Sequence, residues 1–405
     1  MSKTIIFILV VLVFLLACFF LFQLLNQRSE IKNQYILEKE EQKKIKLQKA
    51  LEGFSLPSLT YSDATTEAKN IATQIFNQID TSPTDKITTQ NKNDTINELC
   101  IFSSWNTACS GKFVSKDQIV NVIASGCRML HFTITNYNNQ PTIFGNFTDN
   151  SNNGVLLQDA LNTCKDNAYR HQITVKTNNG NQYLNLTNYK DPLIIMLSFK
   201  YFSKDDVKAY EDEKSKNPDK KLSNPYYTTD FFNNCANSVD NAFNNRLHRD
   251  GNKNAISIYK VKKHQINQKI IIITDITGIN QDNTKTQNFN NSNLNKYSNL
   301  ICGNENGIML YPFKDLSPKD NKTVNNNDAM NQKFIMAVPD NDQNPALSDF
   351  VKCSFYQRCQ FIPVVFYSSD FTNIMKFFQD KHSAFISFKD VNKEILYPNN
   401  KAVMG

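Results

Sequence analysis

From residue 96 onward, short apolar runs alternate with longer polar or amphipathic stretches. Runs that are mostly apolar, without strict alternation, are typical of strands buried on both faces of a sheet. The expected strands are 99–102, 129–134, 142–144, 193–199, 270–274, 334–338, 361–367 and 384–388. The stretches between them predict helices at 116–125, 156–169, 229–247 and 370–380. Strands and helices in this alternation predict an α/β fold built on a parallel sheet.

About eight such strands over roughly 300 residues favour a closed β/α barrel of the TIM type. A doubly wound open sheet is the alternative fold, but no Gly-rich phosphate loop follows the first expected strand. In a β/α barrel the residues that carry chemistry lie at the C-terminal ends of the strands. Candidate site residues are therefore sought at the strand ends.

The N-terminus begins with an unbroken apolar run over residues 5–22. About 20 apolar residues are enough to cross a bilayer core as a helix, so we expect residues 1–26 to form a transmembrane anchor. A cleaved signal peptide is the alternative, because residues 15–18 have the form of a bacterial lipoprotein cleavage box. The apolar residues 19–22 behind that box favour an uncleaved anchor, since a polar tether would be expected there.

The segments after the anchor differ in composition. Positive charge is denser after the apolar run, which favours a cytoplasmic barrel, whereas Asn-x-Ser/Thr sites such as Asn93 would suit a lumenal one. Residues 27–52 are rich in charge and contain neither Gly nor Pro, and Gly53 ends the segment. This composition predicts a helical stalk at 27–53. The expected order is a stalk at 27–53, a linker at 54–95 with a short helix at 67–78, a barrel at 96–392 with an Asn-rich insertion at about 276–330, and a tail at 393–405.

Composition excludes some functions and suggests a source. The net charge of +7 is mild, and no basic run interleaved with aromatic residues predicts nucleic-acid binding. No Cys-x-x-Cys pair occurs among the nine cysteines, so we expect neither zinc nor another cofactor, while a disulfide such as Cys353 with Cys359 stays open. The abundance of Asn, Lys, Ile and Phe indicates an AT-rich genome, as in some large DNA viruses, so a virion membrane component is one expectation.

The strand-end motifs follow the order found in one family of barrels. The first is Ser104-Trp105-Asn106-Thr107, and the next are Gly126-Cys127-Arg128, Pro141 to Gly145, Pro192 to Lys200, and the segments RCQFIPVVFY and SAFISFKD. This order resembles the catalytic barrel of phosphatidylinositol-specific phospholipase C and its phosphodiesterase superfamily. The resemblance spans roughly residues 98–390 and implies a barrel of that type.

The resemblance also implies that the family's catalytic residues are replaced here. The family uses two histidines as base and acid, and acidic residues that hold a metal ion. Trp105 stands at the first histidine position, and Phe144 or Gly145 stands at the second. His131 and Thr133 replace an acidic pair, Lys200 replaces a later acidic ligand, and Asn106 alone is kept. Rings without a titratable proton cannot replace a catalytic acid or base, and one Asn, one Thr and one Lys cannot supply the six or so oxygens that Ca²⁺ needs.

Each replacement has a functional and a structural interpretation. His131 is a relocated acid–base group or a packed strand residue, and Lys200 is an anion-binding cation or a solvated strand end. Trp105 caps a ligand pocket or fills the barrel mouth. Asp275 ends a strand, where it serves a new site or begins a loop. Arg128 is expected to be structural.

These interpretations lead to three hypotheses. The first is a membrane-anchored, catalytically inactive barrel that serves a structural or binding role at a membrane surface, with an unidentified protein partner or a phospholipid or phosphate ligand. The second is an active phosphodiesterase with a rebuilt site that uses His131, Lys200 and Asp275. The third is a protein-binding or lectin-like surface on the Asn-rich segment 281–331.

Overall fold

The structure is a computed structural model that describes residues 64–79, 93–144, 153–279, 282–303, 307–316, 333–368 and 370–391. The expected anchor, stalk and tail, and most of the linker, lie outside these residues. Every described residue belongs to one structural unit, which begins at Ser62. Within the described part, no helix combines the length and the apolar character needed to cross a membrane.

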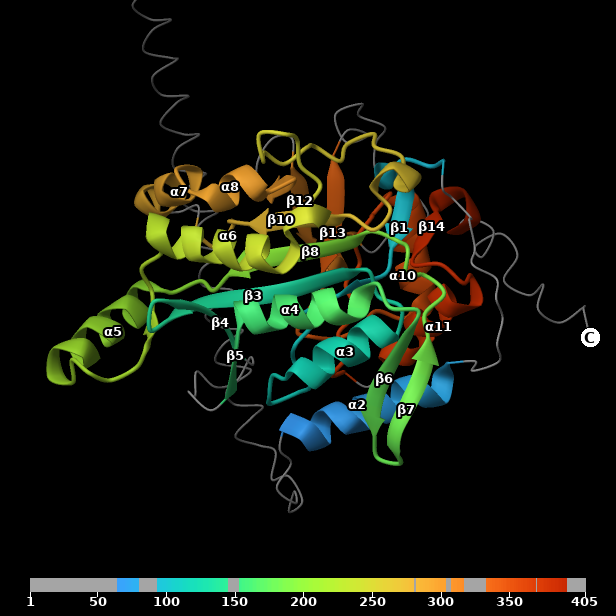
Figure 1. The fold of residues 1–405 in the computed structure, drawn as a ribbon, viewed down its shortest axis with the longest axis horizontal. Coiled ribbons are helices and arrows are strands. Elements are labelled where there is room, and N and C mark those ends of the chain that lie inside the picture. The colour runs from blue at the N-terminus through green and yellow to red at the C-terminus, as the bar shows by residue number, and fades with distance from the viewer. Residues whose placement is uncertain are drawn as a thin grey trace, which may run out of the picture. The chain divides into compact units, whose positions relative to one another are not determined.

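A parallel sheet lies at the centre of the fold (Figure 1). Its strands pair in the order β2–β3–β8–β10–β11–β12–β13, and all these pairs are parallel. The strands are β2 (Ser103–Ser104), β3 (Met129–Tyr137), β8 (Leu193–Phe199), β10 (Ile270–Asp275), β11 (Leu300–Cys302), β12 (Ile308–Pro312) and β13 (Phe334–Val338). Every residue of β8 is buried, as its continuous apolar run predicts. The predicted α/β fold on a parallel sheet is confirmed.

The segment after β13 joins the two ends of this sheet. Phe361 forms parallel bridges to Met336 on β13 and to Ile101, the last residue of β1 (Leu99–Ile101). Val364 forms a parallel bridge to Ser104 on β2. These bridges close the parallel strands into a ring, so the C-terminal ends of all its strands face one side.

Two expected barrel strands lie outside the ring. β4 (Gln140–Phe144) pairs antiparallel with β3, and β14 (Phe385–Ser387) pairs antiparallel with β1. Their places in the ring are taken by β11 and β12, which lie in the range expected to be an insertion. β11 has only three residues, and the apolar run of β12 at 308–311 lies inside the range expected to be an insertion, so neither was predicted as a strand.

Helices surround the ring, and smaller elements extend its loops (Figure 1). Amphipathic α3 begins where the Ser115 hydroxyl accepts a hydrogen bond from the Gln118 amide. The helices are α2 (Ala64–Gln78), α3 (Lys116–Ala124), α4 (Leu157–Ala168), α5 (Lys204–Lys216), α6 (Thr229–Phe243), α7 (Asn283–Asn290), α8 (Asn293–Tyr297), α9 (Phe313–Leu316), α10 (Leu347–Tyr356) and α11 (Phe371–Asp380). The remaining strands are β5 (Gly154–Leu156), β6 (Gln172–Thr177), β7 (Gly180–Asn185) and β9 (Ser223–Asn224).

Arg128 joins three segments at the start of β3. Its guanidinium is fully buried and donates to the Ala168 carbonyl oxygen at 2.6 Å. It also donates to the carbonyl oxygen and the Oδ1 atom of Asn188, at 2.6 and 3.0 Å. A buried charge held by several acceptors at the N-terminal end of a barrel strand serves the fold, as the sequence predicted for this residue.

Candidate functional site

Three neighbouring strands place polar side chains side by side at their C-terminal ends. In the strand register, Ser198 of β8 lies between Thr133 of β3 and Asp275 of β10. His131 lies two residues before Thr133, so both side chains are on the same face of β3. The sequence singled out Thr133, His131 and Asp275, and the fold brings all three to one place.

A chain of hydrogen bonds runs from His131 to Asp275. The His131 Nδ1 atom accepts a hydrogen bond from the Asn106 backbone amide at 3.1 Å. Because Nδ1 is the acceptor, the ring proton is on Nε2, which lies 2.8 Å from the Ser198 hydroxyl oxygen and donates to it. The Ser198 hydroxyl in turn donates to Asp275 Oδ2 at 3.0 Å. Each donor therefore points from His131 toward Asp275.

Asp275 is held at its second oxygen as well. Its Oδ1 atom accepts hydrogen bonds from the Thr277 amide at 2.9 Å and from the Thr277 hydroxyl at 2.6 Å. A carboxylate that bonds the backbone two residues ahead forms an Asx-turn, so Asp275 also shapes the loop after β10. The sequence offered a new site or the start of a loop for this residue, and the structure shows the loop contact together with the link to Ser198.

Trp105 covers the His131 ring. The two rings are stacked with centroids 3.9 Å apart and planes inclined by 4°. His131 is completely buried, and burial lowers its pKa from the ordinary value to about 3. The imidazole is therefore neutral at physiological pH, with both nitrogens in hydrogen bonds inside the protein.

A second polar network begins at Asn106, which the sequence identified as the one retained family residue. Asn106 has a φ of 44°, a left-handed conformation that Asn tolerates better than most residues. Its Oδ1 atom accepts a hydrogen bond from the Thr133 hydroxyl at 2.9 Å. The Tyr367 hydroxyl bonds to Asn106 and to Asp342, and burial raises the pKa of Tyr367.

The oxygens of these networks do not fit a Ca²⁺ ion. Both oxygens of Asp275 and the Oδ1 atom of Asn106 accept hydrogen bonds from protein donors. Ca²⁺ needs about six oxygen ligands, most of them carboxylate or carbonyl. Among the described residues, no group of three or more His, Cys, Asp or Glu side chains could hold a metal ion. The geometry shows a set of internal hydrogen bonds in place of a ligand set.

Lys200 and Phe144 are the other predicted site residues that the structure describes. The Lys200 carbonyl oxygen accepts a hydrogen bond from the Tyr227 hydroxyl at 2.8 Å, and the Lys200 ammonium lies 5.3 Å from the centroid of the Phe202 ring. Phe144 is buried on β4, edge-on to Tyr137, and β4 is not a strand of the ring. Gly145 lies outside the described residues.

Three members of these networks were not predicted from the sequence, namely Ser198, Tyr367 and Asp342. Ser198 carried a usable signal, because it is the one polar residue in the apolar run of β8 and lies next to its end. Tyr367 and Asp342 carried none, since the bonds of Tyr367 to Asn106 and to Asp342 depend on how the loops after β13 and after Val364 fold back over the ring. Such contacts are not encoded in local periodicity.

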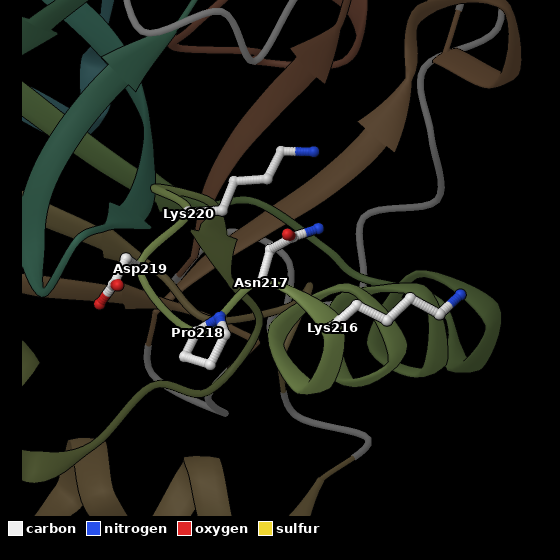
Figure 2. Close-up of a pocket in the computed structure, with 5 residues that line it drawn as sticks. All are labelled: Lys216, Asn217, Pro218, Asp219 and Lys220. Atoms are coloured by element: carbon white, nitrogen blue, oxygen red, sulfur yellow. The ribbon is translucent and has the colours of Figure 1, made fainter.

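A shallow surface hollow lies elsewhere, at the end of α5 (Figure 2). It is lined by Lys216, Asn217, Pro218, Asp219 and Lys220. Exposed Lys220 forms an ion pair with Glu213 at 2.8 Å, and the Asn217 side chain donates to the same carboxylate at 2.9 Å. No residue of the predicted site lines this hollow, so it adds nothing to the chemistry at the strand ends.

Comparisons with known proteins found likeness only among solved structures. No family model and no curated protein matched the chain. The crystal structure of L. pealei PLC21 is 12% identical and covers 75% of this chain and 39% of that protein, with a TM-score of 0.49. For S. officinalis PLC21 the identity is 14%, the coverage 73% and 37%, and the TM-score 0.48. The chain thus matches about two fifths of the length of these two proteins.

A bacterial structure covers more of its own chain. It is the calcium-dependent phosphoinositol-specific phospholipase C from a Pseudomonas species, which is 11% identical. The match covers 71% of this chain and 96% of the bacterial one, with a TM-score of 0.33. At such low identity these likenesses concern the course of the chain and do not extend to activity.

Proposed function

We propose that this chain is a membrane-anchored, phospholipase-C-like barrel without phosphodiesterase activity, which serves a structural or binding role at a membrane surface such as that of a virion. The observation that carries the proposal is the hydrogen bond from the Asn106 amide to His131 Nδ1. This bond occupies the only lone pair with which the neutral imidazole could take a proton.

General acid–base catalysis requires a titratable group within hydrogen-bond reach of the proton that moves. His131 has no such reach to a bound phosphodiester, because Trp105 is stacked on its ring and Ser198 accepts from its Nε2 atom. Trp105 itself has no proton to exchange at physiological pH. The first histidine position of the resembled family and one position of its acidic pair are thus occupied by a pair of rings packed together.

The membrane part of the proposal rests on the sequence alone. Residues 5–22 form an apolar run of the length that spans a bilayer core, and Lys3 and Arg28 flank it. An anchored barrel whose His131 is engaged inside the protein would act through its outer surface, and its partner would be a protein or a phospholipid headgroup.

An active phosphodiesterase with a rebuilt site is the second candidate. One observation favours it, since Ser198 connects His131 to Asp275 and so unites serine, histidine and carboxylate in one chain. The direction of these hydrogen bonds opposes an active site of this kind. A nucleophilic serine gives its proton to the histidine, whereas the Ser198 hydroxyl receives a hydrogen bond from His131 and donates to Asp275.

The deciding experiment measures phosphodiester turnover by the full chain in vesicles that contain phosphatidylinositol, and on a soluble generic phosphodiester, with and without Ca²⁺. The exposed residue His171 provides the matched control, so His131→Ala and His171→Ala are assayed beside the unmodified chain. We expect no turnover in any of the three, with cooperative thermal unfolding that Ca²⁺ does not shift. Turnover that His131→Ala abolishes and His171→Ala leaves intact would establish the second candidate.

A further inference from the structure

Three thiols that the proposed function does not use gather where α10 meets the ring. Cys100 belongs to β1, Cys353 lies in the last turns of α10, and Cys359 follows that helix closely. All three are completely buried and none is in a disulfide. The Cys359 thiol donates to the carbonyl oxygens of Ile335 and Phe361, at 3.4 and 3.2 Å, and Cys353 and Cys100 lie close enough to help raise its pKa.

The end of α10 explains why Cys353 and Cys359 meet. The Gln357 amide donates to the Cys353 carbonyl oxygen at 3.1 Å, and the Cys359 amide donates to the Ser354 carbonyl oxygen at 3.2 Å. Arg358, between them, has a left-handed φ of 47°. A left-handed residue followed by an amide that bonds back five positions is the Schellman ending of a helix.

The Schellman ending brings the side chain after the left-handed residue back against the last full turn. A hydrophobic pair normally fills this contact, and in this chain Cys359 and Cys353 hold the two positions. A disulfide requires Cβ atoms about 3.5–4.5 Å apart, a separation that two side chains packed across a Schellman ending can reach. The two residues are also neighbours in sequence, so closing their loop costs little chain entropy.

We propose that Cys353 and Cys359 form a thiol–disulfide exchange site, which a small-molecule or protein disulfide converts into an intramolecular disulfide across the end of α10. One protein thiolate attacks a sulfur of the donor disulfide, whose S–S bond breaks and releases one thiolate. The second protein thiolate then attacks the protein sulfur of the mixed disulfide and releases the other. Two protein thiols are oxidised, the donor disulfide is reduced to two thiols, and the two protons pass to these thiols.

Cys100 is the third thiol and remains reduced. Its backbone is fixed by antiparallel pairing with Ile386 of β14, away from the helix end that carries the other two thiols. Burial raises the pKa of Cys359, which keeps thiolate scarce in the closed fold. Exchange is therefore expected while the chain folds, or when the end of α10 unwinds, and to be slow in the closed fold.

Trypsin makes this pair directly observable. Cleavage after Lys352, Arg358 and Lys376 places the two cysteines on separate peptides, 353–358 and 359–376. The full chain in detergent is equilibrated with oxidised glutathione in mild denaturant that permits alkylation of buried thiols, then alkylated, digested and analysed by mass spectrometry. We expect the two peptides joined by one disulfide, and separate after reduction.

Variants give the matched controls. Cys100→Ser and Cys109→Ser should keep the joined peptides, and Cys359→Ser should lose them and leave Cys353 alkylated. Alkylation of both Cys353 and Cys359 in the unmodified chain after this treatment would overturn the proposal. A predominant link from Cys100 to either residue would overturn it as well. The decisive readout uses the unmodified chain, so a variant that fails to fold does not affect it.

Discussion

The surroundings of His131 prevent it from acting as a general acid or base. Burial and the Asn106 amide, which donates to Nδ1, favour the neutral imidazole, while Trp105 covers the ring and Ser198 accepts the Nε2 proton. The sequence identified His131 and Trp105 as replacements in the resembled motif. It could not choose between a working and a packed histidine, because that choice depends on hydrogen-bond direction, which only the folded geometry determines.

The lowered pKa of His131 predicts a dependence of stability on pH. The unfolded state binds a proton near pH 6.5, whereas the folded state does so only near pH 3. Stability from this group is therefore complete above pH 6.5 and is lost as pH falls toward 3, by roughly 1.4 kcal/mol per pH unit. Denaturant unfolding of the unmodified chain and of His131→Asn measures this slope. Identical slopes in both proteins would contradict the assignment.

Ser198 should matter more for stability than its small volume indicates. Ser198→Ala removes the acceptor of the His131 proton and the donor to Asp275 Oδ2, which leaves buried polar atoms without partners. We expect a loss of about 1–3 kcal/mol in the free energy of unfolding. Chemical denaturation measures it, with the exposed Ser215→Ala as control. Equal stability of the two variants would show that the chain of hydrogen bonds contributes nothing.

Among the elements, apolar runs predicted strands well and predicted their pairing poorly. The sequence predicted the bounds of four ring strands to within a few residues, namely those of β3, β8, β10 and β13. β4 was expected in the ring but forms a hairpin with β3, because periodicity describes burial and carries no information on which neighbour a strand pairs with. The sequence predicted that the site lies at the strand ends, but it did not predict the loop residues Tyr367 and Asp342.

α2 is tied to the loop that follows Trp105. The Glu67 carboxylate accepts hydrogen bonds from the Ser110 hydroxyl at 3.2 Å and from the Lys112 and Phe113 amides at 3.1 and 3.3 Å. Glu67→Ala should cost about 1–3 kcal/mol and speed hydrogen exchange at the amides of residues 112 and 113. Exchange followed by mass spectrometry tests this, with the exposed Thr65→Ala as control. Unchanged exchange in Glu67→Ala would contradict the contact.

For the whole molecule, folding of the ring and membrane association by the proposed anchor can be tested separately. The ring is closed by Phe361 and Val364, and its described residues form the unit that begins at Ser62. The proposed anchor at residues 1–26 should by itself determine membrane association. The sequence predicted the closed ring from the number and spacing of apolar runs, although two of the strands it counted were not the ones that complete it.

Deletion of residues 1–26 tests the anchor directly. The full chain should stay with membranes after alkaline carbonate extraction, because about 20 apolar residues hold a spanning helix in the bilayer. The deleted chain should move to the supernatant and keep the thermal unfolding of the full chain. A full chain that carbonate extracts would contradict the anchor, and a folded deleted chain that still pellets would place the attachment elsewhere.

The protonation state of His131 tests the central claim most directly. The chain has five histidines, so nitrogen NMR of the full chain labelled at histidine gives few signals, and His131→Asn assigns the one that matters. We predict a neutral ring with its proton on Nε2 from pH 7 down to about pH 4, in keeping with a pKa of about 3. A ring that becomes cationic near pH 6.5, or that carries its proton on Nδ1, would contradict the account and leave His131 able to act as a base.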